Sequence, residues 1–374
     1  MKFVLEAVDP SGARAGRIVL PHGEIETPVF MPVGTQGTVK AMSNEELIEI
    51  GAGIILANAY HLYLRPGVEV IEKAGGLNRF MRWDRPILTD SGGFQIFSLA
   101  ALNKVTPEGV EFRSHLDGSK HFFSPETAVD IQTTIGADII MCLDECTPHP
   151  VDHDTAAKSM RMTVDWATRC KEQWEATPGG RQSLFGIVQG SVYEDLRIES
   201  VERTVEIGFP GYAIGGVSVG ESKEEMRRIV ASCAPRLPED KPRYLMGVGP
   251  PDDFLEAIGR GIDMFDCVMP TRNARNGTLL TSQGNVNIKN ARYKADFDEL
   301  DPACPSPVTT RYSPAYLSHL YRAREILALR LNTLHNLYFM LNLAANCRKA
   351  ILEGRFSEFK STFLAGYLVS DGQA

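Results

Sequence analysis

The feature of this 374-residue chain that most restricts its fold is a regular alternation of short apolar runs with segments of helical pattern. Nearly every run ends at a polar residue or glycine, and the eight runs cover 28–33, 53–57, 86–89, 138–143, 184–188, 212–214, 243–246 and 262–265. Strands that alternate with helices pair in parallel, and eight such units fit a closed (β/α)8 barrel. A doubly wound open sheet is the alternative, but no GxGxxG or P-loop motif follows the first run.

Helical signals occupy the intervals between the runs. Ser43 and Glu46 have the spacing of a capping box, and Ser124 is an N-cap that precedes Pro125 at the first helical position. Further helical patterns cover 154–174, 194–206, 222–233, 251–259 and much of 311–350, and strand-like runs on both sides of 282–284 predict a hairpin.

Composition excludes several classes of protein. With 43% hydrophobic and 23% charged residues the chain is neither disordered nor fibrous. No apolar run reaches the length of a membrane span and the first residues lack the pattern of a signal peptide, so we expect a cytoplasmic protein without membrane contact. The seven scattered cysteines predict free thiols. A net charge of -8 means that any nucleic-acid contact requires a local basic patch.

Three aspartates follow predicted strands: Asp90, Asp144 and Asp266. In a barrel the carboxyl ends of the strands meet at one mouth, where Gln189 and the Gly215–Gly216 pair would join them. Any one aspartate could instead be a turn residue or a helix N-cap, but the set as a whole favours a site. Several carboxylates at one mouth suit chemistry at an anomeric carbon, where one attacks C1′ and another transfers a proton.

Metal and thiol chemistry fit the sequence less well. His149 and His153 are four residues apart, but the neighbouring prolines disfavour a helix that would align them, so we expect surface loop residues. Cys146 and Cys267 have no histidine assigned near them and are expected to be small buried residues.

Between Cys267 and Ala295 the chain carries five basic residues, the last three of them Lys289, Arg292 and Lys294, and no acidic one. Part of this basic stretch could be the exposed face of the hairpin, kept charged as edge strands often are. The alternative is a patch that contacts phosphates beside the strand that ends at Asp266.

Four motifs resemble the bacterial tRNA-guanine transglycosylases: Leu88–Gln95, Asp144–Pro148, Gly211–Gly216 and Met264–Arg272. The resemblance runs in order through about residues 1–365. It implies an α/β fold, a (β/α)8 TIM barrel with inserted antiparallel strands and a C-terminal helical subdomain. It also implies an enzyme that replaces the wobble guanine of tRNAs with GUN anticodons by preQ1 (7-aminomethyl-7-deazaguanine) in queuosine biosynthesis.

Carried over by position, the resemblance makes Asp266 the nucleophile that attacks ribose C1′ and Asp90 the general acid/base. It assigns base binding to Ser91, Gly92, Gly93, Phe94, Asp144, Cys146, Gln189, Gly216, Val217 and Met246, with Phe94 and Met246 on the two faces of the base. It assigns tRNA binding to Gly247, Val248, Gly249, Asp253, Thr271, Arg272, Asn273, Ala274 and Arg275. Val219 and Cys146 match bacterial members, which favours preQ1 over queuine as the incoming base.

The chain departs from the family at its zinc site. The family holds zinc with C-x-C-x-x-C and a downstream histidine, and the aligned residues here are Cys304, Ser306, Thr309 and His335. Hydroxyl groups are not ordinary zinc ligands, so Ser306 and Thr309 predict that this chain holds no metal, and no other cofactor is expected. The aligned dimer region contains Tyr316 and His319, and the resemblance implies a homodimer.

We therefore expect residues 1–300 to form the barrel with its catalytic site and inserted hairpin, 301–365 to form the C-terminal subdomain, and 366–374 to be a tail. The expected partners are tRNA with a GUN anticodon, preQ1 and guanine. Two other functions stay open: a tRNA-binding accessory protein without turnover, and a different N-glycosyl exchange or hydrolysis reaction. The incoming base could also be the nitrile precursor of preQ1 or queuine.

Overall fold

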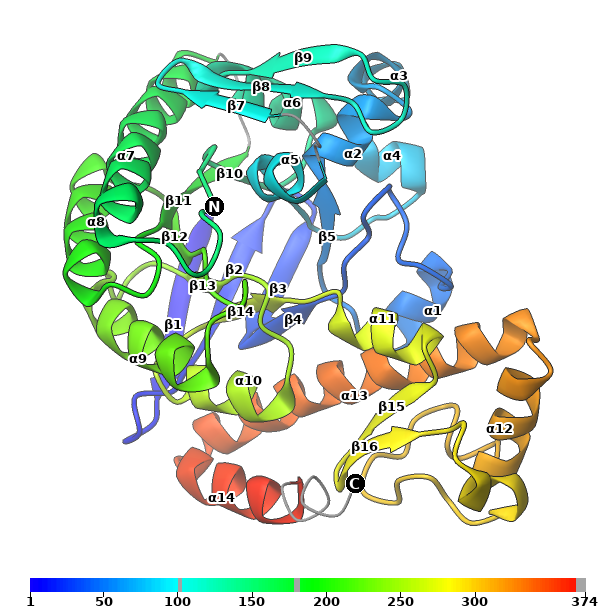
Figure 1. Cartoon of the computed structure of the whole chain (residues 1–374). Helices are drawn as coiled ribbons and strands as arrows, with labels where there is room; N and C mark the ends of the chain where they lie inside the picture. Colours follow the sequence, from blue (N-terminus) through cyan, green and yellow to red (C-terminus); the bar gives the residue numbers. More distant parts are fainter. Residues whose placement is uncertain (100–102, 178–181, 368–374) are drawn as a thin grey trace.

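The computed structural model describes residues 1–99, 103–177 and 182–367, which leaves most of the expected tail outside the described residues. Its centre is a parallel sheet with the strand order β4-β14-β13-β12-β11-β10-β6-β5 (Figure 1). These strands are β4 (Val29–Met31), β5 (Ile55–Asn58), β6 (Ile87–Asp90), β10 (Ile139–Met141), β11 (Ser183–Val188), β12 (Gly211–Ile214), β13 (Arg243–Leu245) and β14 (Met264–Asp266).

The two edges of this sheet meet and close it into a barrel. A parallel bridge joins Val33 to Leu56, and the Leu56 N–H donates to the Pro32 carbonyl at 3.0 Å. The (β/α)8 barrel expected from the sequence is confirmed, each of the eight predicted runs overlaps one barrel strand, and the open doubly wound sheet is excluded.

Helices surround the barrel and begin at the predicted capping residues. Ser43 and Glu46 form the capping box, and the Ser124 side chain accepts a hydrogen bond from the Thr127 N–H. These helices are α1 (Asn44–Glu49), α2 (Ala59–Leu64), α3 (Val68–Lys73), α4 (Leu77–Met81), α5 (Gly93–Leu99), α6 (Pro125–Ile135), α7 (His153–Ala176), α8 (Glu194–Ile207), α9 (Lys223–Cys233), the 3₁₀ turn η1 (Ala234–Arg236) and α10 (Pro251–Ile258).

One end of the barrel is closed by an antiparallel sheet that the sequence analysis did not predict, formed by β1 (Lys2–Val8), β2 (Arg14–Leu20) and β3 (Gly23–Thr27). Ile18, Leu20 and Ile25 of this sheet belong to the same buried apolar cluster as Leu88 and Phe185 of the barrel strands. His22 donates its backbone N–H at 3.0 Å to Asp138, which precedes β10. The sheet therefore covers the amino ends of the strands and leaves their carboxyl ends as the open mouth.

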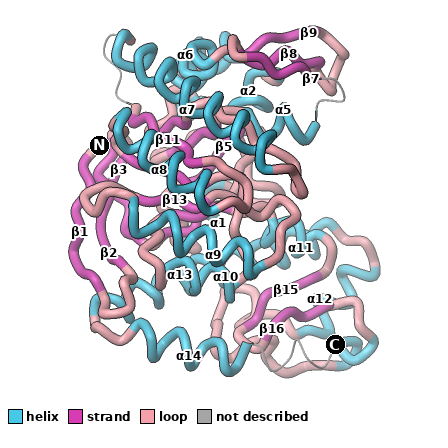
Figure 2. Tube along the Cα trace, turned by 60° about the vertical axis from the view of Figure 1, so that its left-hand side comes forward, coloured by secondary structure: helices cyan, strands magenta, loops and turns pink. Residues whose placement is uncertain are grey.

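Two further units lie at opposite ends of the molecule (Figure 2). The first is an antiparallel sheet inserted between α5 and α6, formed by β7 (Asn103–Thr106), β8 (Gly109–Arg113) and β9 (Lys120–Phe123). The second follows the last barrel strand and contains α11 (Met269–Arg275), β15 (Thr278–Thr281), β16 (Gly284–Asn287), η2 (Ala291–Ala295), α12 (Pro314–Arg322), α13 (Ile326–Leu352) and α14 (Phe356–Tyr367). Inserted antiparallel strands, the hairpin near Ser282 and the C-terminal helices are thus confirmed, while the domain boundary at residue 300 stays a prediction.

Helix α13 connects the C-terminal unit to the barrel (Figure 1). Asn336 donates to the carbonyls of Pro270 and Thr278 at 2.9 and 3.0 Å. Near the C-terminal end of the helix, Arg348 donates to the carbonyls of Gly16 and Thr27, each at 2.9 Å. Among the described residues, no helix combines the length and the apolar character needed to cross a membrane.

Candidate active site

The predicted strand-end residues gather at the open mouth of the barrel. Asp90 and Asp266 are the last residues of β6 and β14, and Asp144, Gln189 and Gly216 follow β10, β11 and β12. Because these strands are parallel neighbours in one barrel, their carboxyl ends open on the same side. The Gln189 amide donates to Oδ2 of Asp144 at 2.7 Å, so residues 45 apart in the chain share one polar cluster.

Asp90 is 8% exposed and is held by three donors. The Asn58 amide donates to Oδ2, the Gln95 amide donates to the same oxygen at 2.8 Å, and the Ala59 N–H donates to Oδ1 at 3.0 Å. Burial outweighs these donors and raises the pKa of Asp90 to about 7, with a further contribution from the negative charge of Asp266. A carboxyl group with this pKa can both give and take a proton near neutral pH.

Asp266 receives two hydrogen bonds on one oxygen. The Tyr244 hydroxyl donates to Oδ1 at 2.5 Å and the Gly247 N–H donates to the same atom at 2.9 Å. Burial raises the pKa of Asp266, and the two donors oppose that rise because they stabilise the ionised form. Within the described residues Oδ2 accepts no hydrogen bond, which leaves one carboxylate oxygen available to a ligand.

A second polar cluster lies around Asp144, a buried carboxyl group whose pKa is raised by desolvation. Ser91 donates to Oδ1 at 3.2 Å, opposite the Gln189 contact to Oδ2. Glycines permit the close approach: an ideal Cβ at Gly93 would lie 2.5 Å from the Asp144 carbonyl, and one at Gly216 would lie 2.0 Å from Oε1 of Gln189. Gly216 also has a φ of +61°, which favours glycine.

The other residues predicted to bind the base differ in exposure. Phe94, on α5, is 48% exposed and Met246 is partly buried, so the ring of Phe94 and the thioether of Met246 can both contact a planar ligand. Cys146 and Val217 are buried. Burial raises the pKa of both Cys146 and Cys267 to about 12, which keeps the thiols protonated and confirms them as small buried residues.

The residues predicted to bind tRNA fall into two groups. Arg272 is exposed and Asn273 and Arg275 are partly exposed, all on α11, immediately after the Asp266 strand. Gly247 lies beside Asp266, and Gly249 packs so closely on Cys267 that a Cβ would lie 2.6 Å from its Cβ. The buried group offers little exposed surface to RNA, and it comprises Val248, Gly249, Asp253, Thr271 and Ala274.

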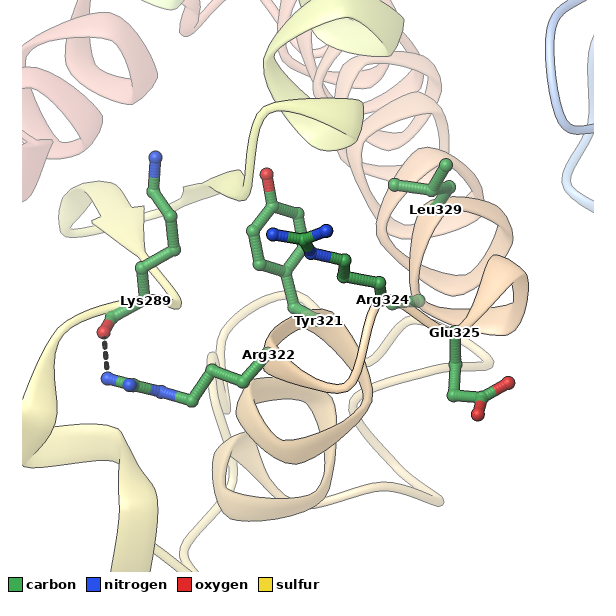
Figure 3. Close-up of a pocket in the computed structure, with 7 residues that line it drawn as sticks. Lys289, Tyr321, Arg322, Arg324, Glu325 and Leu329 are labelled. Carbon is green, nitrogen blue, oxygen red and sulfur yellow. Dashed lines mark hydrogen bonds between the residues drawn. The ribbon is translucent and has the colours of Figure 1, made fainter.

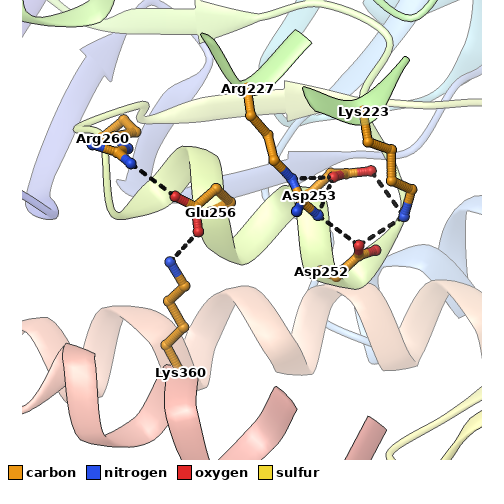
Figure 4. A network of polar contacts seen from close by, with 7 residues as sticks. All are labelled: Lys223, Arg227, Asp252, Asp253, Glu256, Arg260 and Lys360. Carbon is orange, nitrogen blue, oxygen red and sulfur yellow. Dashed lines mark hydrogen bonds and ion pairs between the residues drawn. The ribbon is translucent and has the colours of Figure 1, made fainter. Parts of the chain in front are cut away.

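Asp253 belongs to an ion-pair network between α9 and α10 (Figure 4). Its Oδ1 accepts from the Arg227 Nη2 at 2.6 Å, and Lys223 lies 3.3 Å from its Oδ2. Asp252 shares the same two cations at 2.7 Å each. The network fixes the start of α10, which follows the Gly247–Gly249 turn. Asp253 therefore stabilises that turn indirectly, through the position of α10.

Sequence reasoning missed the residues that hold the aspartates: Asn58, Gln95 and Tyr244. It also missed Arg197, which donates to the Gly216 carbonyl at 3.0 Å. For Asn58 a signal existed, because it directly follows a predicted strand, as Asp90 does. The expectation that His153 lies in a loop was wrong: His153 opens α7 after the N-cap Asp152, and its Nε2 contacts Asp195 at 2.7 Å.

A surface cavity of about 460 Å³ lies on the C-terminal unit (Figure 3). Lys289, Arg322 and Arg324 supply three cations around Tyr321, against one acidic residue, Glu325. The Tyr321 hydroxyl donates to the Arg275 carbonyl at 3.3 Å, so this cavity adjoins α11. We call Arg272, Arg275, Lys289, Arg322 and Arg324 together the basic face.

The residues aligned with the family's zinc ligands form a buried hydrogen-bond cluster. His335 donates from Nε2 to the Leu280 carbonyl at 2.7 Å, and its Nδ1 lies 3.0 Å from the Ser306 hydroxyl. Thr309 lies 3.1 Å from the same hydroxyl. Both imidazole nitrogens are occupied and burial lowers the pKa of His335, so the ring is neutral. These residues do not fit a tetrahedral zinc site, and the described residues contain no group of three or more His, Cys, Asp or Glu arranged to hold a metal.

Comparisons with known proteins agree with this geometry. A family model described as queuine tRNA-ribosyltransferase matches residues 9–368. A queuine tRNA-ribosyltransferase of Thermoanaerobacter sp. (strain X514) is 59% identical over 357 residues, which cover 96% of this chain and 95% of the relative. Relatives of the same name from Halothermothrix orenii and Solidesulfovibrio magneticus are 57% and 58% identical, over 95% and 98% of this chain and 95% and 97% of their own lengths.

Proposed function

The chain belongs to the queuine tRNA-ribosyltransferase family, and on that premise we propose that it exchanges the wobble guanine of GUN-anticodon tRNAs for preQ1 through an ester between Asp266 and the ribose. The chain is a pentosyltransferase, a tRNA-guanine transglycosylase of queuosine biosynthesis. The observation that supports the covalent mechanism is the pair of carboxyl groups at the barrel mouth: partly buried Asp266, with an oxygen that accepts no hydrogen bond from the described residues, and buried Asp90, with a pKa of about 7.

In the first half of the proposed reaction, Oδ2 of Asp266 attacks C1′ as the bond from C1′ to the guanine nitrogen breaks. The electron pair of that bond leaves with guanine, which takes a proton from Asp90. In the second half, Asp90 removes a proton from the incoming base, whose nitrogen attacks C1′ and releases the Asp266 carboxylate. Each half replaces one bond to C1′ by another, so no redox cofactor or nucleotide is required.

The base pocket supports a purine-like ligand. Asp144 is an acceptor for the N–H groups on the Watson–Crick edge that guanine and preQ1 share, and Ser91 and Gln189 hold its carboxylate in place. Phe94 and Met246 are placed to contact the two faces of the ring. The identity of preQ1 rests on the resemblance of Val219 and Cys146 to bacterial members.

The basic face supports docking of tRNA phosphates along the C-terminal unit and α11, the helix that follows the Asp266 strand. It joins Arg272 and Arg275 of α11 to Lys289, Arg322 and Arg324, on a chain whose net charge is -8. Partial burial and, after it, the charge of Arg272 lower the pKa of Arg275. The proposal includes a cytoplasmic location and a homodimer, in which exposed Tyr316, Ile326 and Leu327 on the packed helices α12 and α13 would be covered.

We further propose that the enzyme works without zinc. Ser306, Thr309 and His335 satisfy one another by hydrogen bonds in the place where the family resemblance puts the metal. Metal analysis by inductively coupled plasma spectrometry of protein purified without chelators should find no stoichiometric zinc. One zinc per folded chain would refute this part of the proposal.

Radiolabelled guanine exchange into tRNA tests the main proposal. The unaltered protein should incorporate label, and Asp266→Asn should not, while both should bind tRNA with similar affinity. Denaturing gels with an incoming-base analogue should trap an adduct that maps to Asp266. RNA binding without exchange in the unaltered protein would instead identify a non-catalytic accessory subunit.

A further inference from the structure

Arg197 lies in the first turn of α8 and is completely buried. Its guanidinium group donates to four backbone carbonyls of two loops at the barrel mouth. Nε donates to Ser191 at 2.7 Å, Nη1 donates to Val188 at 3.0 Å and to Gly215 at 2.7 Å, and Nη2 donates to Gly216 at 3.0 Å. One side chain therefore ties the segment after β11 to the segment after β12.

Burying the charge of Arg197 costs free energy, and the four carbonyl contacts are the interactions that offset this cost. No carboxylate is hydrogen-bonded to Arg197 among the described residues, so its charge is buried without an ion-pair partner. A cation in the first turn also faces the positive end of the helix dipole. Core packing alone would be served as well by an apolar side chain of similar volume.

The carbonyl contacts determine where neighbouring N–H groups point. A trans peptide is planar, with its C=O and the following N–H on opposite sides. Since the Gly215 and Gly216 carbonyls are turned toward Arg197, the N–H groups of Gly216 and Val217 are turned away from it. Neither N–H donates to another described residue. An ideal Cβ at Gly215 would lie 3.0 Å from Nε2 of Gln189, so the same loop packs on the amide that holds Asp144.

We propose that Arg197 is a positioning residue for base selection, which aims the Gly216 and Val217 N–H groups at the ring carbonyl of a bound 6-oxopurine or 7-deaza-6-oxopurine. This inference rests on the proposed function and adds to it the group that sets the donor geometry of the pocket. Arg197 itself does not contact the base. Its removal should let the peptides rotate and weaken recognition of the carbonyl oxygen specifically.

The test compares Arg197→Lys and Arg197→Met with the unaltered protein by equilibrium dialysis of two bases without tRNA: guanine and 2-aminopurine, which lacks the 6-oxygen. Guanine binding should weaken by about tenfold or more, the equivalent of one hydrogen bond, while 2-aminopurine binding changes little. Arg197→Lys keeps the buried cation but cannot bridge both loops, and it is the variant to use if Arg197→Met does not fold. In exchange assays the KM for guanine should rise while the KM for tRNA stays within about twofold.

Arg243 provides a matched control because it is also buried and donates to a backbone carbonyl, that of Leu237 at 2.6 Å, but lies at the start of β13, at the closed end of the barrel. Arg243→Lys and Arg243→Met should lower Tm without changing the preference for guanine over 2-aminopurine. Unchanged preference in folded Arg197→Lys, or an equal loss in the Arg243 variants, would overturn the inference. A protein that binds guanine selectively but exchanges none into tRNA would refute the proposed function and leave this test valid.

Discussion

Replacing Tyr244 by phenylalanine removes the shortest hydrogen bond to Asp266, the 2.5 Å contact from the hydroxyl to Oδ1, and keeps the buried ring. Burial and the charge of Asp266 raise the pKa of Tyr244 well above its usual value, so the hydroxyl is a permanent donor. A hydrogen bond to a charged group contributes about 1.5–3 kcal/mol. At about 1.4 kcal/mol per pKa unit, its loss should raise the pKa of Asp266 by about one to two units.

The direction of the effect on rate follows from the role of each carboxyl group. Asp266 must be ionised to attack and Asp90 must be protonated to assist departure of guanine, so kcat/KM should pass through a maximum with pH. In Tyr244→Phe the acid limb, which reports ionisation of Asp266, should move to higher pH by about one to two units. The alkaline limb should stay near its position in the unaltered protein, because Tyr244 does not contact Asp90.

Tyr212→Phe is the matched control, because Tyr212 is a buried tyrosine on the neighbouring strand whose hydroxyl accepts from the Phe209 N–H at 3.1 Å. Its pH profile for guanine exchange should match that of the unaltered protein, although stability falls by about 1 kcal/mol. A Tyr244→Phe enzyme with an unshifted acid limb would refute the assignment of that limb to Asp266.

Three further outcomes follow from local geometry. Gly216→Ala should raise the KM for guanine by about tenfold or more, because its Cβ would meet Gln189, whereas Gly118→Ala, which also has a positive φ but meets no atom within 4 Å, should leave that KM unchanged. The double variant Ser306→Cys with Thr309→Cys should bind one zinc per chain, and its failure to do so would show that Cys304 and His335 do not converge with these positions. Arg169 lowers the pKa of Glu126 to about 2, so the pair stabilises the fold above about pH 4.5 and loses its effect as the pH falls toward 2. Since both side chains are about one-third exposed, the pair contributes about 1 kcal/mol or less to the free energy of unfolding. The Tm of Arg169→Met should therefore fall less steeply over that pH range than the Tm of the unaltered protein.

The barrel could be predicted from the sequence because its strands are buried on both faces and are therefore apolar throughout. The strands also end where the mouth becomes polar, which made Asp90, Asp144 and Asp266 recognisable. The N-terminal sheet gave no such signal, since β1 is largely exposed although most of its residues are apolar. Its role in closing the barrel depends on Ile18 and Ile25, which become buried only through contact with distant strands.

The residues that support the site could not be predicted for a related reason. Tyr244 lies in an apolar run, and only the direction of its side chain inside the barrel brings it to Asp266, 22 residues later. Arg197 appears in the sequence as an ordinary helical residue, because its four acceptors are backbone carbonyls, which leave no trace in residue identity. The resemblance to a family predicted which residues contact substrate, but not which residues hold them in place.

Helix α13 restricts how far the basic face can move relative to Asp266. Asn336 bonds it to the segment that carries the basic face, and Arg348 bonds it to the sheet that seals the barrel floor. These contacts lie in the middle and near the C-terminal end of one continuous helix, so we expect the spacing between the basic face and Asp266 to stay nearly constant. If tRNA docks on the basic face as proposed, an RNA stem whose loop cannot turn its nucleotide outward over that spacing should bind without reacting.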